Sequence, residues 1–148
     1  MIKSTELPAE PALHIQQEIE IAAPPAVVFE SMLEQLGPGG DTPDGKPMPM
    51  RLEAWPGGRW FRDLGDNAGH FWGHVQVIKP PALLEITGPL FMSYPAISHV
   101  QYRLTAQGKG TLLALTHRAM GQIAPEHRAG VNKGWEYMLS RIKNRALK

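Results

Sequence analysis

Regularly spaced turn signals between residues 56 and 110 constrain the fold of this chain more than any other feature. They are Pro56-Gly57-Gly58, Asp66-Asn67-Ala68-Gly69, Pro80-Pro81 and Gly108-Lys109-Gly110. Such spacing between short strand-like segments favours an antiparallel meander over parallel βαβ units. The 15 Gly and 14 Pro residues of this 148-residue chain fit the same picture, because sharp turns use both residue types.

The end of the chain carries the clearest helical pattern, from Pro125 to about Leu147. Apolar residues recur there on one stripe, opposite a polar stripe; they are Val131, Trp135, Met138, Leu139, Ile142 and Ala146. At about 1.5 Å per residue the helix would be roughly 33 Å long, enough to cross a small sheet. Gly130 and Gly134 interrupt it near the stripe, each at a cost of about 1 kcal/mol relative to alanine. We expect glycine at these two positions either to allow close helix–sheet contact or to leave open space for a ligand.

The first half of the chain predicts a strand and then a helix. Leu13, Ile15, Ile19 and Ile21 alternate as in a half-buried strand, and the helix follows Ala22-Ala23-Pro24-Pro25 and ends at Gly37-Pro38. We interpret residues 1–12 as a flexible arm and residues 13–148 as a single domain. Between Gly37 and Pro49, eight of thirteen residues are Gly or Pro, so this segment is either a lid over a site or a surface loop.

The hairpin turns predict which residues share a face, since cross-strand partners point to the same side. The more apolar face, which we assign to the core, follows from turns at 66–69, 80–81 and 107–110. It collects Trp60, Arg62, Leu64, Phe71, Gly73, Val75, Val77, Leu84, Ile86, Val100, Tyr102, Leu104, Leu113, Leu115 and His117.

Two polar residues on this inner face need an explanation. Arg62 is expected opposite Gly73, where the missing side chain leaves room for a guanidinium or a ligand; a register shift of one residue would instead turn it to water. A buried arginine requires an acidic partner or an anionic ligand. His117 is either a hydrogen-bonded core histidine or a general acid–base group.

Composition excludes several classes of function. The formal net charge of +1 gives no global field that would attract nucleic acid, and the uncharged stretch from Ile86 to Tyr102 contains two prolines and cannot span a membrane. With no cysteine and no signal peptide pattern, a cytoplasmic location is expected. We expect no cofactor and no metal; His70 and His74 would need a third ligand to bind zinc, and Asp63 is the only near candidate.

Several short motifs in this order resemble a known superfamily. They are Ile19-Glu20-Ile21-Ala22-Ala23-Pro24 before Val28-Phe29, Pro56-Gly57-Gly58-Arg59, Gly73-His74-Val75, Ile78-Lys79-Pro80-Pro81, Thr111-Leu112-Leu113, Thr116-His117 and Gly134-Trp135. From Leu13 to about Ile142 the chain resembles the SRPBCC superfamily (START and Bet v 1-like proteins). Within it, the chain is similar to bacterial proteins related to the C-terminal domain of the Hsp90 ATPase activator. The resemblance implies an α+β helix-grip fold, in which a curved antiparallel sheet of six to seven strands wraps around a long C-terminal helix. In such a fold a cavity lies between the sheet and this helix.

This reading favours a module that binds a small apolar or amphipathic molecule over a catalyst, and it assigns no catalytic residue. The expected ligand-binding residues are Trp60, Arg62, Phe71, Gly73, Tyr102, Leu115, His117, Gly134, Trp135, Met138 and Leu139. One alternative is an enzyme of the cyclase, hydrolase or isomerase type with His117 as acid or base. Another is an interaction protein that uses Leu90, Phe91, Met92 and Tyr94 as an exposed apolar patch, and a homodimer is open as well.

Overall fold

The computed structural model describes residues 12–91 and 95–148. Its elements, in chain order, are β1 (Ala12–Ile21), α1 (Pro25–Gln35), β2 (Arg51–Leu52), β3 (Arg59–Gly65), β4 (Ala68–Lys79), β5 (Leu83–Gly88), β6 (Ala96–Gln107), β7 (Gly110–Gly121) and α2 (Pro125–Ala146). The predicted flexible arm lies outside the described residues except for Ala12, which begins β1.

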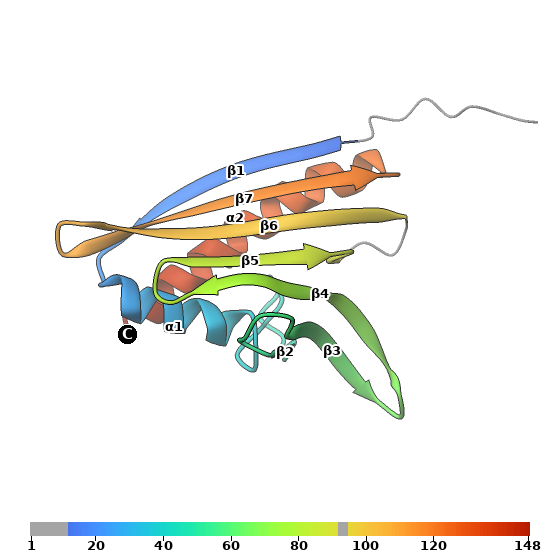
Figure 1. Cartoon of the computed structure of the whole chain (residues 1–148), viewed down its shortest axis with the longest axis horizontal. Helices are drawn as coiled ribbons and strands as arrows, with labels where there is room; N and C mark the ends of the chain where they lie inside the picture. Colours follow the sequence, from blue (N-terminus) through green and yellow to red (C-terminus); the bar gives the residue numbers. More distant parts are fainter. Residues whose placement is uncertain (1–11, 92–94) are drawn as a thin grey trace, which may run out of the picture.

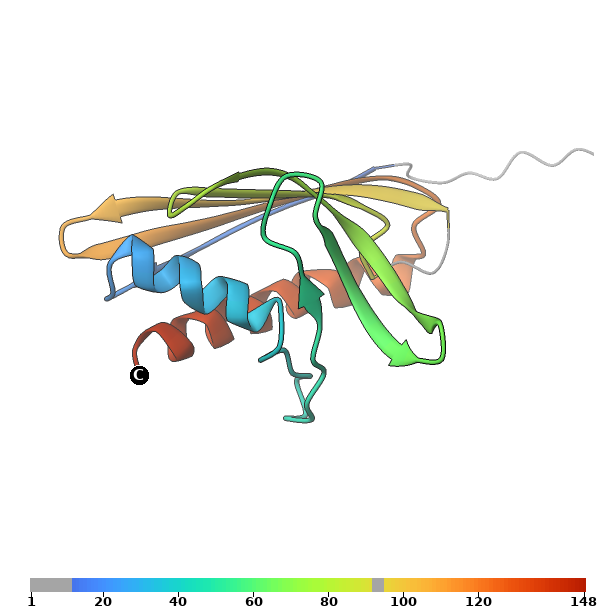
Figure 2. The same ribbon diagram turned by 60° about the horizontal axis from the view of Figure 1, so that its bottom comes forward.

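The strands form one antiparallel sheet in the order β1-β7-β6-β5-β4-β3-β2. Each strand from β2 to β6 is paired with the next strand along the chain, which confirms the predicted meander, and β1 joins the far edge beside β7. Both helices lie on the same side of the sheet, and α2 packs against α1 and β1 (Figures 1 and 2). This is the predicted helix-grip α+β arrangement.

The β6–β7 hairpin has the register that its sequence predicts. Gln107 pairs with Gly110, Tyr102 with Leu115 and Val100 with His117. Tyr102, Leu115, Val100 and His117 are buried, because they face the helices across the core.

The β3–β4 hairpin differs from the prediction. Its turn is Asp66-Asn67, with φ of 53° and 61°, so the strands close one residue earlier than expected. Phe61 pairs with Phe71 and Trp60 pairs with Gly73, which leaves Trp72 as an extra, bulged residue. Trp72 is buried in the core, whereas Phe71 is 44% exposed. The prediction that Phe71 faces the core is therefore wrong, because the bulge turns Trp72 inward instead.

Three further assignments, two to the inner face and one to the surface, need correction. Leu64 lies near the hairpin tip and is exposed. A second irregularity in β4, between Val75 and Val77, puts Val77 opposite Glu85 and moves Ile78 into contact with the core. Leu90, expected in an exposed patch, is only 2% exposed and belongs to the core, whereas Phe91 of the same patch is exposed. Met92 and Tyr94 of that patch lie outside the described residues.

The helices begin and end where the sequence predicts. Each has proline at its first position, where the missing N–H loses no partner. The predicted stripe of α2 faces the sheet: five of its six residues, Trp135, Met138, Leu139, Ile142 and Ala146, are buried, and Val131 packs against the core. Within the described ranges, neither helix is long and apolar enough to cross a membrane.

Candidate functional site

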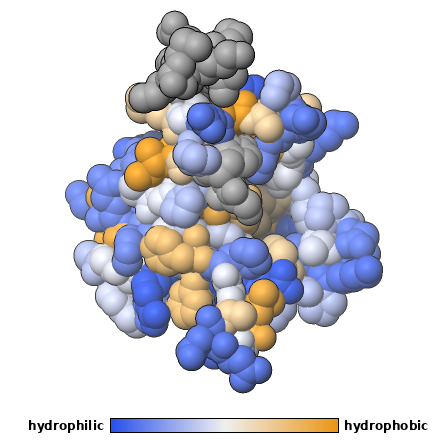
Figure 3. Space-filling view, turned by 90° about the vertical axis from the view of Figure 1, so that its right-hand side faces the viewer, coloured by the Kyte–Doolittle hydropathy of each residue, from blue (hydrophilic) through white to orange (hydrophobic). Residues whose placement is uncertain are grey.

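A groove of about 490 Å³ opens along the first half of α2. Its opposite wall is the 41–48 segment, and Phe91 closes one end. The lining is mostly apolar or aromatic and comprises Asp41, Thr42, Pro43, Met48, Phe91, His127, Gly130, Val131, Gly134, Trp135, Tyr137 and Met138. Figure 3 shows the end of the molecule that carries the start of α2, where apolar patches alternate with hydrophilic ones.

The two glycines of α2 keep this groove open. A Cβ added at Gly130 or at Gly134 would meet no heavy atom within 4 Å outside its immediate helix. Close helix–sheet contact therefore does not explain them. Of the two features that the sequence offered, the structure has open space beside these glycines.

Asp41 fastens the loop wall of the groove to both helices. Its Oδ1 accepts hydrogen bonds from Gln35 Nε2 at 2.8 Å and from the Tyr137 hydroxyl at 3.2 Å, and its Oδ2 lies 2.9 Å from Arg141 Nη2. Burial acts to raise the pKa of Asp41, but the bonds from Gln35, Arg141 and Tyr137 together hold it below its ordinary value. The carboxylate is thus ionised at neutral pH and already satisfied by the protein.

Two more contacts fix the same segment. The Tyr137 hydroxyl donates to the Thr42 carbonyl at 2.9 Å, and Arg145 Nη2 donates to the Gly39 carbonyl at 3.0 Å. Despite its Gly and Pro content, the segment from Gly37 to Pro49 is held as a wall of the groove. The sequence offered lid or surface loop and gave no sign of these partners on α2.

His117 lies beneath the groove, behind Trp135. The Trp135 indole N–H donates to His117 Nδ1 at 2.9 Å, and His117 Nε2 lies 3.0 Å from Ser98 Oγ. An indole can only donate, so Nδ1 is the acceptor and Nε2 carries the proton that Ser98 accepts. Burial, and secondarily the charge of His127, lowers the pKa of His117 to about 4.

This geometry favours the core-histidine interpretation of His117. The imidazole is neutral at pH 7, only 1% exposed, and both of its nitrogens are engaged by other side chains. In this conformation neither nitrogen is available to move a proton to or from a substrate.

Tyr102 differs from His117 in that its buried polar atom makes no hydrogen bond within the described part of the chain. Its side chain is 1% exposed, and its hydroxyl has no hydrogen-bond partner among residues 12–91 and 95–148. The ring meets Trp135 edge-on, with 6.2 Å between centroids. Burial raises the pKa of Tyr102, so the hydroxyl stays protonated and can donate.

An aromatic cluster surrounds the closed end of the groove. Phe91 lies 5.0 Å from Trp72, 5.5 Å from Trp60 and 5.9 Å from Trp135, measured between ring centroids. Trp60 is fully buried, and its indole N–H donates to the Leu36 carbonyl at 2.7 Å, which ties β3 to the end of α1. Phe91 remains 37% exposed, so it is the member of the cluster that meets solvent.

Arg62 lies on the other side of Phe91. It pairs across the hairpin with His70, and not with Gly73 as expected. It lines a separate hollow of about 370 Å³ together with Gly69, His70, Phe71, Trp72, Leu90 and Phe91. Gly73 gives no space to a ligand, since a Cβ there would lie 2.8 Å from both Ile86 Cγ2 and the Thr87 carbonyl oxygen.

The structure therefore divides the expected site residues into three groups. Gly134, Trp135 and Met138 line the groove; Arg62 and Phe71 line the neighbouring hollow; Trp60, Gly73, Tyr102, Leu115, His117 and Leu139 belong to the packed interior. Sequence reasoning missed the walls supplied by residues 41–48 and by Tyr137. The polar pair Asp41-Thr42 within the Gly- and Pro-rich segment was the available signal.

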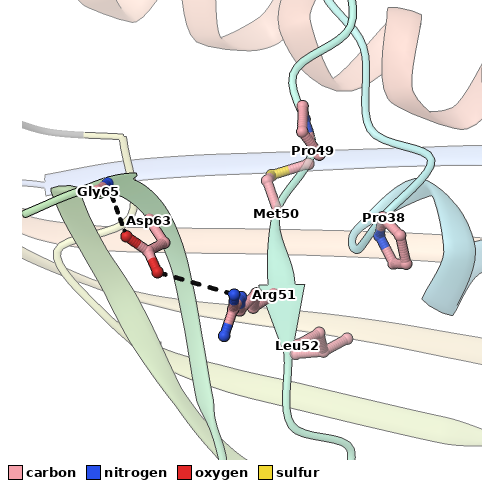
Figure 4. Close-up of a pocket in the computed structure, with 7 residues that line it drawn as sticks. All are labelled: Pro38, Pro49, Met50, Arg51, Leu52, Asp63 and Gly65. Carbon is pink, nitrogen blue, oxygen red and sulfur yellow. Dashed lines mark hydrogen bonds and ion pairs between the residues drawn. The ribbon is translucent and has the colours of Figure 1, made fainter.

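A larger open hollow, of about 710 Å³, lies between β2 and the tip of β3 (Figure 4). Its charged groups satisfy each other: Arg51 Nη2 is 3.8 Å from Asp63 Oδ2, and Asp63 Oδ1 accepts from the Gly65 amide at 2.8 Å. Pro49 and Met50 lie on the same segment as Arg51, and Pro38 lies on the far side of that segment from Asp63. The hollow has neither the continuous apolar wall nor the unfilled helix positions of the groove on α2.

Comparison with known families places this fold. The family model described as Activator of Hsp90 ATPase homolog 1-like protein matches residues 22–146. The chain belongs to this family. The matched range includes every residue that lines the groove and both helices.

Solved structures share the fold at low identity. A protein from Rhizobium leguminosarum is 20% identical, with a TM-score of 0.69 over 91% of this chain and 95% of that one. CalU16 from Micromonospora echinospora is 23% identical, with a TM-score of 0.62 over 91% and 75%. Ara h 8.0201, of Bet v 1-like fold, is 13% identical, with a TM-score of 0.66 over 92% and 98%. Among proteins of curated function, none matches.

Proposed function

We propose that this protein binds a small amphipathic molecule in the groove between α2 and the 41–48 segment. The observation that carries the proposal is the open space over Gly130 and Gly134 in an otherwise apolar wall. Binding sites for small molecules are mostly apolar clefts of about 300–1,000 Å³ with a few placed polar groups, and this groove has that size and character.

The geometry of His117 supports a binding role over the enzymatic alternative, because both of its nitrogens are occupied within the protein. The chaperone in the family's description is not implied for this chain, since one fold hosts many unrelated functions. A cytoplasmic location and homodimer formation stay predictions.

The test of this proposal is a substitution that fills part of the groove, with ligand binding and the free energy of unfolding both measured on the variant. Gly134→Leu adds a side chain where the structure has open space, so we expect the free energy of unfolding to rise by about 0.5–1 kcal/mol through better helix propensity. We expect the same substitution to weaken binding of the fluorescent amphipath 1-anilinonaphthalene-8-sulfonate at least about tenfold, because it occupies the ligand's place.

Lys133→Leu is the matched control, since Lys133 is exposed on the same turn of α2 and does not line the groove. It should leave the affinity for the dye unchanged. Loss of stability in Gly134→Leu would show that the glycine serves packing, and unchanged dye binding in a stably folded variant would overturn the proposed site.

A further inference from the structure

The groove and the hollow that contains Arg62 share one wall. Phe91 lines both, and Trp72 and Trp135 pack against it from the two sides. The apolar groove on α2 and a hollow of about 370 Å³ that carries a cation therefore meet at one aromatic ring, which is 37% exposed.

Arg62 is the arginine of this region without a carboxylate partner. Along the neighbouring strands, Arg51 pairs with Asp63, and Arg59 pairs with Glu53 at 2.8 Å. Within residues 12–91 and 95–148, no carboxylate oxygen lies within 4.0 Å of the Arg62 guanidinium. Its neighbour Asp63 is already engaged, so the hollow keeps a positive charge that the fold does not neutralise.

His70 adds a second nitrogen donor beside Arg62. The two residues are direct cross-strand partners, and such pairs have Cβ atoms about 5 Å apart. The His70 ring lies 15° from parallel with Trp72, at 6.4 Å between centroids, and both residues line the hollow. A planar guanidinium next to an imidazole N–H matches the two oxygens of a carboxylate.

We propose that the ligand is an amphipathic anion, with its apolar body in the groove on α2 and its carboxylate against Arg62 and His70. This inference rests on the proposed function and adds the charge of the head group. Among the described residues that line the apolar groove there is no arginine or lysine, and Arg141, which flanks it, is paired with Asp41. The carboxylate reaches its partners over Phe91, so the aromatic ring packs against the ligand between its two ends.

The experiment compares three probes of equal chain length, namely decanoate, 1-decanol and decylamine, by isothermal titration calorimetry. The wild-type protein should bind decanoate at least about tenfold more tightly than decanol, and decylamine most weakly, because a charge-assisted hydrogen bond outweighs a neutral one. Arg62→Gln should reduce the affinity for decanoate about tenfold and leave that for decanol unchanged. His70→Gln should reduce the affinity for decanoate by a smaller factor.

Arg103→Gln is the matched control, since it removes an exposed arginine from β6, outside both hollows. It should change none of the three affinities. Equal binding of decanoate and decanol, or an Arg62→Gln variant that loses both alike, would overturn the anionic head group while leaving the groove in place. Failure of all three probes, together with dye binding that Gly134→Leu does not alter, would instead refute the proposed function itself.

Discussion

At the scale of single residues, the contact between Trp135 and His117 joins the groove to the core. Trp135 lines the groove with its ring and donates its indole proton to His117 Nδ1. The His117 Nε2–H donates a hydrogen bond to Ser98 Oγ, so three side chains from α2, β7 and β6 are fixed in one orientation. The wall of the groove is therefore rigid at this point, as a preformed site requires.

The depressed pKa of His117 makes stability depend on pH. Because the folded-state pKa is about 4 and the unfolded value about 6.5, the unfolded chain binds the proton first as the pH falls between these values. The stabilisation is complete above about pH 6.5, and about 3 kcal/mol is lost by pH 4. Urea unfolding at pH 7 and pH 4 should show this loss in the wild type and a smaller one in His117→Gln. Equal losses in both proteins would contradict it.

The buried hydroxyl of Tyr102 leads to the prediction that its removal stabilises the protein. A buried polar group without a partner costs about 1–3 kcal/mol, so Tyr102→Phe should raise the free energy of unfolding by about 1 kcal/mol. Thermal and urea unfolding of the two proteins would measure the difference. A clear loss of stability in Tyr102→Phe would show that the hydroxyl has a partner after all.

At the scale of elements, the tether between the 41–48 segment and α2 determines whether the groove has two walls. Asp41→Asn removes the charge that holds Arg141 and weakens the bonds from Gln35 and Tyr137. We expect a loss of about 1–2 kcal/mol of stability and faster amide exchange in residues 37–49, with weaker dye binding. Hydrogen-exchange mass spectrometry measures the exchange.

Asp44→Asn is the control for this prediction, because Asp44 is exposed on the same segment and does not line the groove. It should change neither the exchange of residues 37–49 beyond its own turn nor the affinity for the dye. Equal effects of the two substitutions would show that Asp41 is not the tether.

The two hairpins show why some elements could be predicted from sequence and others could not. In β6–β7, apolar and polar residues alternate cleanly and the turn at Gly108 fixes the register. In β3–β4, aromatic residues occur on both faces, so a shift of one residue leaves an equally plausible pattern. The bulge at Trp72 depends on tertiary packing against Trp60 and Phe91, which no local pattern encodes.

At the scale of the whole molecule, the fold and family follow from the order of elements, but the candidate site does not. The glycines of α2 could be recognised as exceptional from the sequence, since each interrupts a strong helical pattern. The opposite wall comes from residues about 90 positions earlier, and the Asp41–Arg141 and Tyr137–Thr42 contacts that bring them there are long-range side-chain pairings. Their partners could be identified only from the folded chain.

The four tryptophans provide the most direct test of the site, because each indole N–H gives a separate NMR signal. Trp135 lines the groove, Trp72 lines the neighbouring hollow, and Trp55 is 58% exposed and lines neither. Titration of the ¹⁵N-labelled protein with decanoate should shift the indole signals of Trp135 and Trp72 and the amide signals of Gly130 and Gly134, and leave Trp55 unchanged. Shifts confined to Arg51 and Gly65, in the hollow beside β2, or no shifts at all, would contradict a binding site on α2.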